Sequence, residues 1–131
     1  MLSKPKYGWS TLKIGNFTSR ISYLTDVPFD SLNASLASLK YGTSLSIGFD
    51  AEGWEFDIMS NKLCTFIIMN NEEGEDVLIK ESVSKEELIK EIVDDIELNV
   101  SEWAFWDLDE YVVEKNKENI LNLIKEIRTL L

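Results

Sequence analysis

The sequence predicts an α+β fold, in which an antiparallel sheet of five to seven strands has about three helices packed on it. Two patterns support this class. Strand-like segments of alternating apolar and polar residues dominate positions 7–81, and apolar residues recur at helical spacing after position 84. A chain of 131 residues lies within the size of one domain, so we expect a single α+β domain over residues 1–131.

Two strands joined by a tight turn open the predicted sheet. Residues 7–14 and 17–25 are rich in β-branched and aromatic side chains, which favour strands. Gly15 and the asparagine after it separate the two segments, and glycine readily accepts the positive φ of a hairpin turn. A helix follows, because Pro28 suits a first helical turn and Gly42 suits a C-terminal end.

Further strands are expected in the middle of the chain, over residues 44–49, 54–58, 63–69 and 75–81. The third of these is almost wholly apolar and is predicted to be the central strand. A turn over Asn70–Gly74 precedes the fourth. In the second, apolar residues alternate with Glu55 and Asp57, so we expect these two carboxylates to share a solvent-exposed face.

The last third of the chain is predicted to be helical. Ser84 and Glu87 fit a capping box, and an apolar stripe follows them. A short turn is expected near residues 101–106 and a final helix from about Glu114. Residues 111–113 are compatible with either a seventh strand or a connector.

Composition and charge indicate which classes of function and partner to expect. The net charge is −11, residues 46–131 carry twenty-two acidic and eight basic side chains, and there is no histidine. The negative electrostatic field of such a protein repels nucleic acid and anionic lipid, and it speeds encounter with a cationic partner. Without histidine, the commonest proton-transfer group near neutral pH is missing. We therefore expect a binding protein rather than an enzyme, with neither nucleic acid nor membrane as partner.

Sequence motifs for cofactors and export are missing. One cysteine, Cys64, and no histidine make zinc improbable on composition, and neither of the common glycine-rich phosphate loops occurs. We expect no cofactor. Cys64 lies in an apolar run, where a thiol usually behaves as a small buried hydrophobe. No uninterrupted apolar run reaches membrane-spanning length and no secretion signal opens the sequence, so a cytoplasmic location is expected.

The first candidate site is an acidic cluster, defined as Asp50, Glu52, Glu55 and Asp57. Three interpretations are open. The carboxylates can be a solvated strand edge that prevents sheets from sticking together. They can bind basic side chains of a partner. They can hold a hard metal ion, although the spacing of a calcium loop is missing and we expect no metal.

The second candidate is the aromatic and acidic segment 102–110. Its three large rings within four positions cannot all face one core from a helix, so at least one is expected to be partly exposed. Trp106 is the expected interface anchor, with Asp107 and Asp109 beside it. The alternative is that the rings fill the gap between helices and sheet, which suits Trp103 better than Trp106.

Several segments resemble a known family. Residues 7–14, 21–25 and 49–54, with Trp103 and Trp106, are similar in style to the small immunity proteins encoded beside bacterial polymorphic toxins, including contact-dependent growth inhibition systems. The resemblance extends to size, acidity and the order of strands before helices. It implies a cytoplasmic bacterial protein that neutralises one cognate toxin, often a basic nuclease, by covering its active site. No family residue carries over by position.

The expected function is therefore that of an immunity protein, monomeric when free, whose acidic surface binds a basic toxin domain. Two alternatives from other classes remain open. One is a carboxylate-based, metal-dependent hydrolase. The other is a homo-oligomeric adaptor in which the aromatic segment associates with itself.

Overall fold

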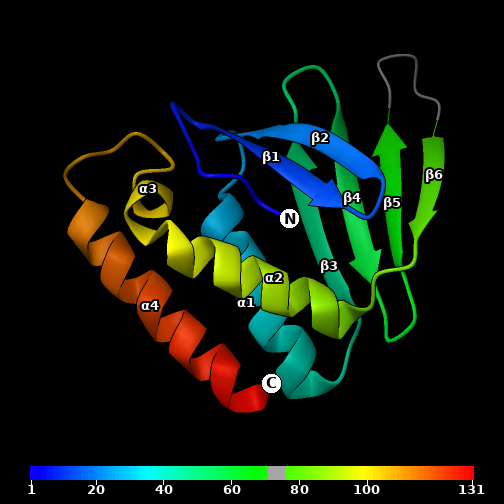
Figure 1. Ribbon diagram of the computed structural model, residues 1–131. Coiled ribbons are helices and arrows are strands. Elements are labelled where there is room, and N and C mark those ends of the chain that lie inside the picture. Colours follow the sequence, from blue (N-terminus) through cyan, green and yellow to red (C-terminus); the bar gives the residue numbers. More distant parts are fainter. Residues whose placement is uncertain (71–75) are drawn as a thin grey trace.

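Two antiparallel sheets and four helices are formed by residues 1–70 and 76–131, the part of the chain that the computed structural model describes (Figure 1). The predicted α+β class is confirmed. In chain order the elements are β1 (Trp9–Ile14), β2 (Phe17–Ser22), α1 (Val27–Tyr41), β3 (Leu45–Asp50), β4 (Glu55–Ser60), β5 (Thr65–Asn70), β6 (Asp76–Glu81), α2 (Lys85–Leu98), α3 (Val100–Ala104) and α4 (Val113–Leu130).

The prediction of a single sheet with five to seven strands is wrong in its arrangement. The described strands divide into the hairpin β1–β2 and a four-stranded sheet in the order β3-β4-β5-β6, and one more helix is present than expected. The hairpin buries its apolar face, which includes Leu12 and Ile21, over the larger sheet. Phe17 of β2 meets Phe56 of β4 edge to face, with ring centroids 5.3 Å apart. Alternating residues give a strand a face to bury, but they do not say which sheet it joins.

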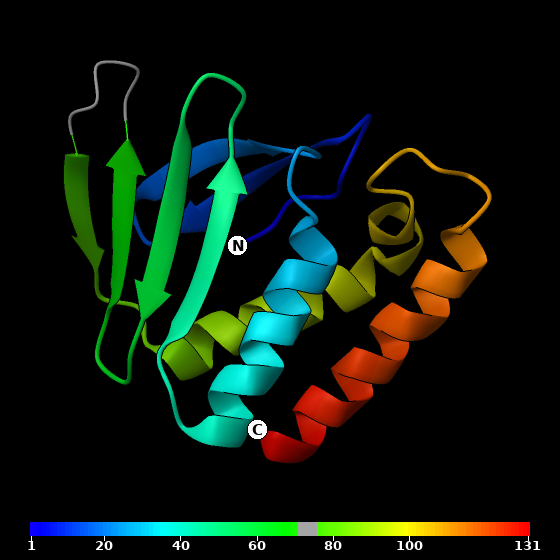
Figure 2. The same cartoon turned by 180° about the vertical axis from the view of Figure 1, so that it is seen from behind.

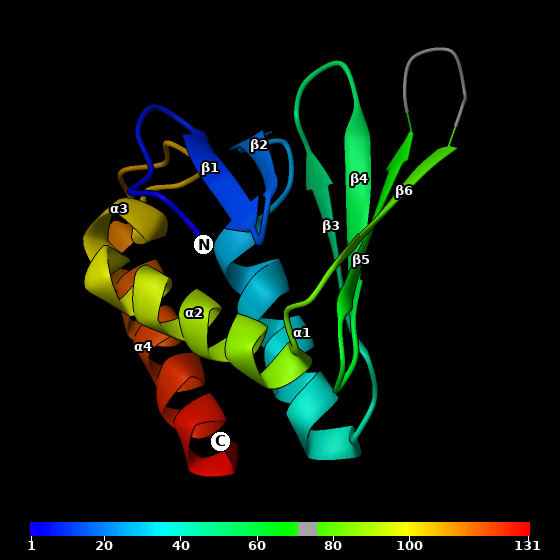
Figure 3. The ribbon, with the colours of Figure 1, turned by 45° about the vertical axis from the view of Figure 1, so that its right-hand side comes forward.

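The described helices and the hairpin all lie on one side of the four-stranded sheet (Figures 2 and 3). We call the covered side the inner face and the opposite side the outer face. Helix α1 contacts β3, α2 and α4, and α4 also packs on α3. The inner face contributes a set of buried apolar side chains to the core: Leu45, Ile47, Phe49, Phe56, Ile58 and Ile67.

Phe56 is the centre of an aromatic group on the inner face. Its ring stacks on Phe49 and on Trp54, with both centroid distances 5.2 Å and interplanar angles of 26° and 30°. Such a pair contributes about 0.5–1.5 kcal/mol beyond the area it buries. Since three rings, with that of Phe17, contact Phe56, this group ties β3, β4 and the hairpin together.

The predicted helix ends are confirmed. Pro28 lies in the first turn of α1, and Gly42 ends the helix with φ 66°, a left-handed conformation that costs glycine little. At the start of α2, the Ser84 hydroxyl accepts a hydrogen bond from the backbone N–H of Glu87 at 3.2 Å. These ends depend on local residues only, so the sequence was sufficient to place them.

Other local predictions had mixed outcomes. The short turn expected near residues 101–106 contains helix α3. Residues 111 and 112 lie in the connector to α4 and Val113 begins that helix, so no strand forms there. β5 is an interior strand, as predicted, and Cys64 is buried as a free thiol. The turn predicted over Asn70–Gly74 falls almost entirely outside the described residues.

Replacement of the capping serine tests the start of α2. Ser84→Ala should lower the free energy of unfolding by about 1 kcal/mol, because the Glu87 N–H loses its acceptor. Chemical denaturation measures the loss against Ser82→Ala, at an exposed serine just before the helix. Equal stability of the two variants would contradict the cap.

Candidate functional site

Strand β4 carries the centre of the acidic cluster. Glu55 and Asp57 are exposed on the outer face while Phe56 and Ile58 are buried, which confirms the predicted shared face of the two carboxylates. In the strand register, Asp50 of β3 lies opposite Glu55. Facing side chains on neighbouring strands have Cβ atoms about 4.5–5.5 Å apart. Three carboxylates therefore share a small area at one end of the sheet.

One interpretation of this cluster, a solvated strand edge, is wrong for Glu55 and Asp57. Strand β4 pairs with β3 on one side and with β5 on the other, so it has no free edge to protect. Only Asp50 lies on an edge strand, β3. The two central carboxylates occupy the open face of an interior strand, where protection against edge-to-edge pairing does not explain them.

Asp50 and Glu52 shape the turn between β3 and β4. One carboxylate oxygen of Asp50 accepts a hydrogen bond from the backbone N–H of Glu52 at 2.7 Å. Glu52 has φ 54°, in the left-handed region that costs a residue with a Cβ roughly 1–2 kcal/mol. The Glu52 side chain is exposed, and it lines neither of the hollows described below.

A hollow of about 340 Å³ lies beside these carboxylates, and we call it the acidic hollow. Asp30, Glu55 and Asp57 line it, and Gly48 is also part of the lining. A Cβ added to Gly48 would lie 2.9 Å from a carboxylate oxygen of Asp57, so the glycine keeps this space open. Thr25 also lines the hollow, and its buried hydroxyl has no hydrogen-bond partner among the described residues.

A second hollow, also of about 340 Å³, adjoins the first at the β3–β4 turn. Asp50 and Trp54 line it, and Glu55 and Asn70 line both hollows. Of the described residues that line the two spaces, none is basic. The adjoining hollows therefore present carboxylates to solvent over the end of the sheet.

Among the described residues, no ion pair neutralises the carboxylates that line the two hollows. Within the described part of the chain, the ion pairs involve other acids, and Asp30, Asp50, Glu55 and Asp57 take part in none of them. Carboxylates close together repel each other, so a cation of a partner would gain from each of them.

The prediction of Trp106 as an exposed anchor is wrong. Its ring is 3% exposed, and its indole N–H donates a hydrogen bond to the backbone oxygen of Thr25 at 2.9 Å. It packs on Trp103, with centroids 5.1 Å apart. The expected partly exposed ring is that of Phe105, which is 40% exposed. Trp106 thus positions Thr25 beside the acidic hollow and offers no surface to a partner.

Asp107 and Asp109 lie in the loop between α3 and α4, away from the sheet carboxylates. Asp107 accepts from the backbone N–H of Asp109 at 3.2 Å, and Asp109 accepts from that of Tyr111 at 3.0 Å. Both side chains thereby hold turns of the loop. Neither lines the hollows at Glu55.

Asp26 lies near both Asp30 and Asp107, whose charges act on it. Nothing in the sequence around Asp26 predicts this position. Burial raises the pKa of its carboxyl, and the negative charges of Asp30 and Asp107 raise it further, although the residue keeps contact with solvent. Asp30 lines the acidic hollow, whereas Asp107 belongs to the loop. The negative surface therefore continues from the sheet, past the start of α1, to the loop.

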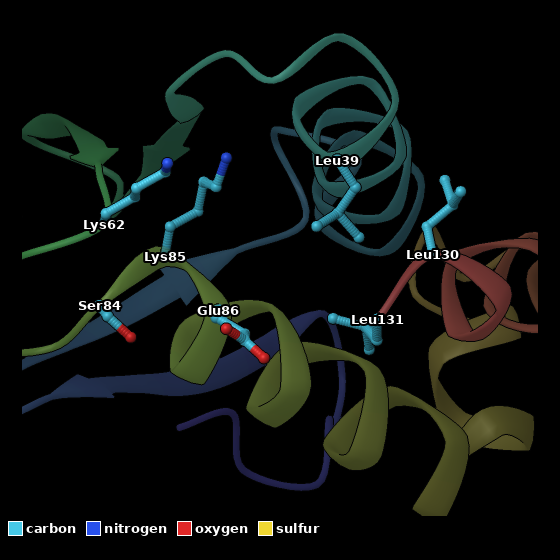
Figure 4. Close-up of a pocket in the computed structure, with 7 residues that line it drawn as sticks. All are labelled: Leu39, Lys62, Ser84, Lys85, Glu86, Leu130 and Leu131. Atoms are coloured by element: carbon cyan, nitrogen blue, oxygen red, sulfur yellow. The ribbon is translucent and has the colours of Figure 1, made fainter.

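The other end of the sheet, at the β4–β5 turn, carries lysines and leucines beside a third hollow. A hollow of about 380 Å³ lies between the β4–β5 turn, the start of α2 and the last residues of the chain. Figure 4 shows Lys62 and Lys85 side by side along one part of it, with Leu39 and Leu131 across from them. The Lys85 ammonium donates a hydrogen bond to the backbone oxygen of Thr43 at 2.9 Å. Glu86 also lines this hollow, so its charge is mixed, whereas the hollows at the other end of the sheet have carboxylates and no basic residue among their described lining.

The described residues show no metal-binding arrangement and no membrane-spanning helix. Over residues 1–70 and 76–131, no group of three or more Asp, Glu, Cys or His side chains is arranged to hold a metal ion. Within the same residues, no helix has the length and apolar character needed to cross a membrane. Comparisons with protein-family models, curated proteins and solved structures gave no match. The acidic site is therefore the feature of the described residues that bears on function.

The raised pKa of Asp26 predicts a pH-dependent effect of Asp26→Asn. The pKa of the Asp26 carboxyl is higher in the folded protein than its ordinary value of 3.8. The carboxyl therefore ionises more readily in the unfolded chain, and the stability of the wild type falls as pH rises from 3.8 through the pKa of the folded state. The variant lacks this loss. Its melting temperature should exceed that of the wild type at neutral pH and converge with it in acid.

Thermal unfolding across this pH range provides the measurement. Glu91→Gln, at an exposed position of α2, controls for the general effect of one less charge. A stability difference that is independent of pH would contradict the assignment.

The corrected position of Trp106 predicts a structural role. Trp106→Phe should lower the free energy of unfolding by about 2 kcal/mol, because it leaves the Thr25 carbonyl without its donor and removes buried volume. Phe105→Ala is the matched control at the partly exposed ring. Denaturant unfolding should show the larger loss for Trp106→Phe, and the reverse order would contradict the assignment.

Proposed function

We propose that the protein is an immunity protein that binds a basic toxin domain and blocks its active site with the acidic end of the four-stranded sheet. The observation that carries this proposal is a pair of carboxylates, Glu55 and Asp57, on the open face of interior strand β4, with Asp30 lining the same acidic hollow. Among the described residues none of the three takes part in an ion pair. A protein gains nothing in folding from like charges held together and left uncompensated. A cationic partner supplies the missing charge.

The electrostatics of the whole chain support the same partner. With a net charge of −11, the molecule attracts a cationic protein over a distance set by the ionic strength. The carboxylates at the hollows then determine where the partner's lysines and arginines are bound, and charged groups brought into close contact hold the complex together. An interface of about 1,600 Å² in total is ordinary for such a complex.

The proposal includes a place of action and a source for the partner. The protein acts in the bacterial cytoplasm as a monomer before it binds, and it performs no chemistry of its own. The partner is expected to be the small basic C-terminal domain of a large secreted protein, encoded immediately upstream. Co-expression of that domain should arrest growth, and this chain should restore it.

Charge reversal at β4 tests the acidic site. Glu55→Lys with Asp57→Lys should weaken binding of the basic domain roughly a hundredfold at low salt, because two attractive pairs become repulsive. It should also flatten the dependence of affinity on salt. Calorimetric titration at several salt concentrations measures both effects.

The matched control is Glu91→Lys with Glu126→Lys, which makes the same change in net charge at exposed positions of α2 and α4. Both double variants should fold, because all four side chains are exposed. Equal affinity and equal salt dependence of the two double variants would show that the total charge, and not the β4 site, determines binding.

A further inference from the structure

The outer face of the four-stranded sheet carries exposed apolar side chains next to the acidic cluster. We define the outer apolar patch as Met59 of β4, Phe66 and Ile68 of β5, and Leu78 of β6. Leu78 is 66% exposed and Met59 45%, whereas Phe66 and Ile68 are half-buried by their neighbours. The helices and the hairpin lie on the other side of this sheet (Figure 3), so the described residues leave the patch uncovered.

The four side chains form one continuous surface. In the strand register, Met59 lies opposite Phe66, and Ile68 lies opposite Leu78. Phe66 and Ile68 are two positions apart on β5, which places them on the same face. Side chains in these relations are in contact range. A strand that is apolar on both faces is typical of one covered on both sides, and β5 has a cover on its inner face only.

The charge around the patch indicates what covers it. Asp57 lies directly opposite Ile68, so the acidic cluster begins where the patch ends. The described outer face carries four carboxylates, those of Asp50, Glu55, Asp57 and Asp76, against the ammonium of Lys80. The complement of such a surface is an apolar area bordered on one side by lysines or arginines.

A second copy of the chain does not provide that complement. Two outer faces packed together would remove eight carboxylates from water in the presence of two lysines, at a cost that apolar contact does not offset. The net charge of −11 on each copy adds repulsion over a longer range. The occupant indicated by the charges is therefore a different, cationic protein.

We propose that the outer apolar patch is the docking surface for the apolar part of a cationic protein partner, with the acidic cluster binding the flanking basic residues. This proposal rests on the proposed function and names the anchoring surface of the same site. The anchors are Leu78 and Met59, in place of the buried Trp106. Apolar anchors set the affinity of a complex, whereas exposed charges mainly set its rate of formation and its specificity.

Two synthetic helical peptides of equal length and equal positive charge serve as probes. One has leucines along one face bordered by lysines, and in the other every leucine is replaced by serine. The leucine peptide should bind about tenfold or more tightly than the serine peptide, since it alone can bury apolar surface. Its binding should shift the backbone amide resonances of β4, β5 and β6 on the outer face.

Leu78→Gln is the test variant and Leu98→Gln the control, because Leu98 is also an exposed leucine and lies at the end of α2, outside the patch. Leu78→Gln should weaken binding of the leucine peptide about tenfold, and Leu98→Gln should leave it unchanged. Met59→Gln provides a second variant on the patch. Thermal unfolding verifies that each variant folds, and exposed positions make this the expected result.

The outcomes separate this inference from the proposed function. Equal binding of the two peptides, or equal affinity of Leu78→Gln and Leu98→Gln, overturns the docking surface and leaves the charge-based proposal intact if Glu55→Lys with Asp57→Lys still weakens binding. Weaker binding by Leu78→Gln alone, with no effect of charge reversal, supports the patch and overturns the acidic site. Sedimentation that shows a wild-type dimer dissociated by Leu78→Gln overturns the cationic partner in favour of a second copy.

Discussion

The register of β4 is the constraint on which the acidic site depends. Side chains alternate along a strand, so Phe56 and Ile58 are buried only when Glu55 and Asp57 face outward. A slip of one residue would place both carboxylates against the apolar core, at a cost of several kcal/mol for each unpaired charge. The rings of Phe49, Trp54 and Phe17 around Phe56 oppose that slip. The register of β4 therefore both buries Phe56 and Ile58 in the core and directs Glu55 and Asp57 to the surface.

The distribution of cations explains why the acidic cluster stays uncompensated. Residues 1–45 carry an excess of basic side chains, five against two acidic ones. Several of these cations lie over aromatic rings near them in the sequence or across the hairpin: Lys6 over Tyr7 at 5.5 Å, Arg20 over Trp9 at 4.2 Å and Lys40 over Tyr41 at 5.9 Å. Such contacts are short-range. Within the described part of the chain, none of these three cations is in an ion pair with the carboxylates of the sheet.

Predictions based on neighbouring residues succeeded, and those that needed contacts between distant elements failed. The Gly15 turn, the end of α1 at Gly42 and the Ser84 cap all depend on residues a few positions apart. The burial of Trp106 could not be predicted from its neighbours, because residues 103–106 do not form one helix. Helix α3 ends at Ala104, and the chain then turns and carries the Trp106 ring to Thr25, 81 positions away.

The sequence by itself determined the six strands, the three longer helices and the direction of Glu55 and Asp57 away from the core. Both properties follow from the period of the side chains along a single element. Only the tertiary structure decided that the hairpin and helices cover one face of the sheet and that Asp30 and Gly48 line the same hollow. It also decided that Phe66 and Ile68 of the apolar β5 lie on the face that the described residues leave uncovered. These features depend on how separate elements pack together, and the periodicity within each element leaves that packing undetermined.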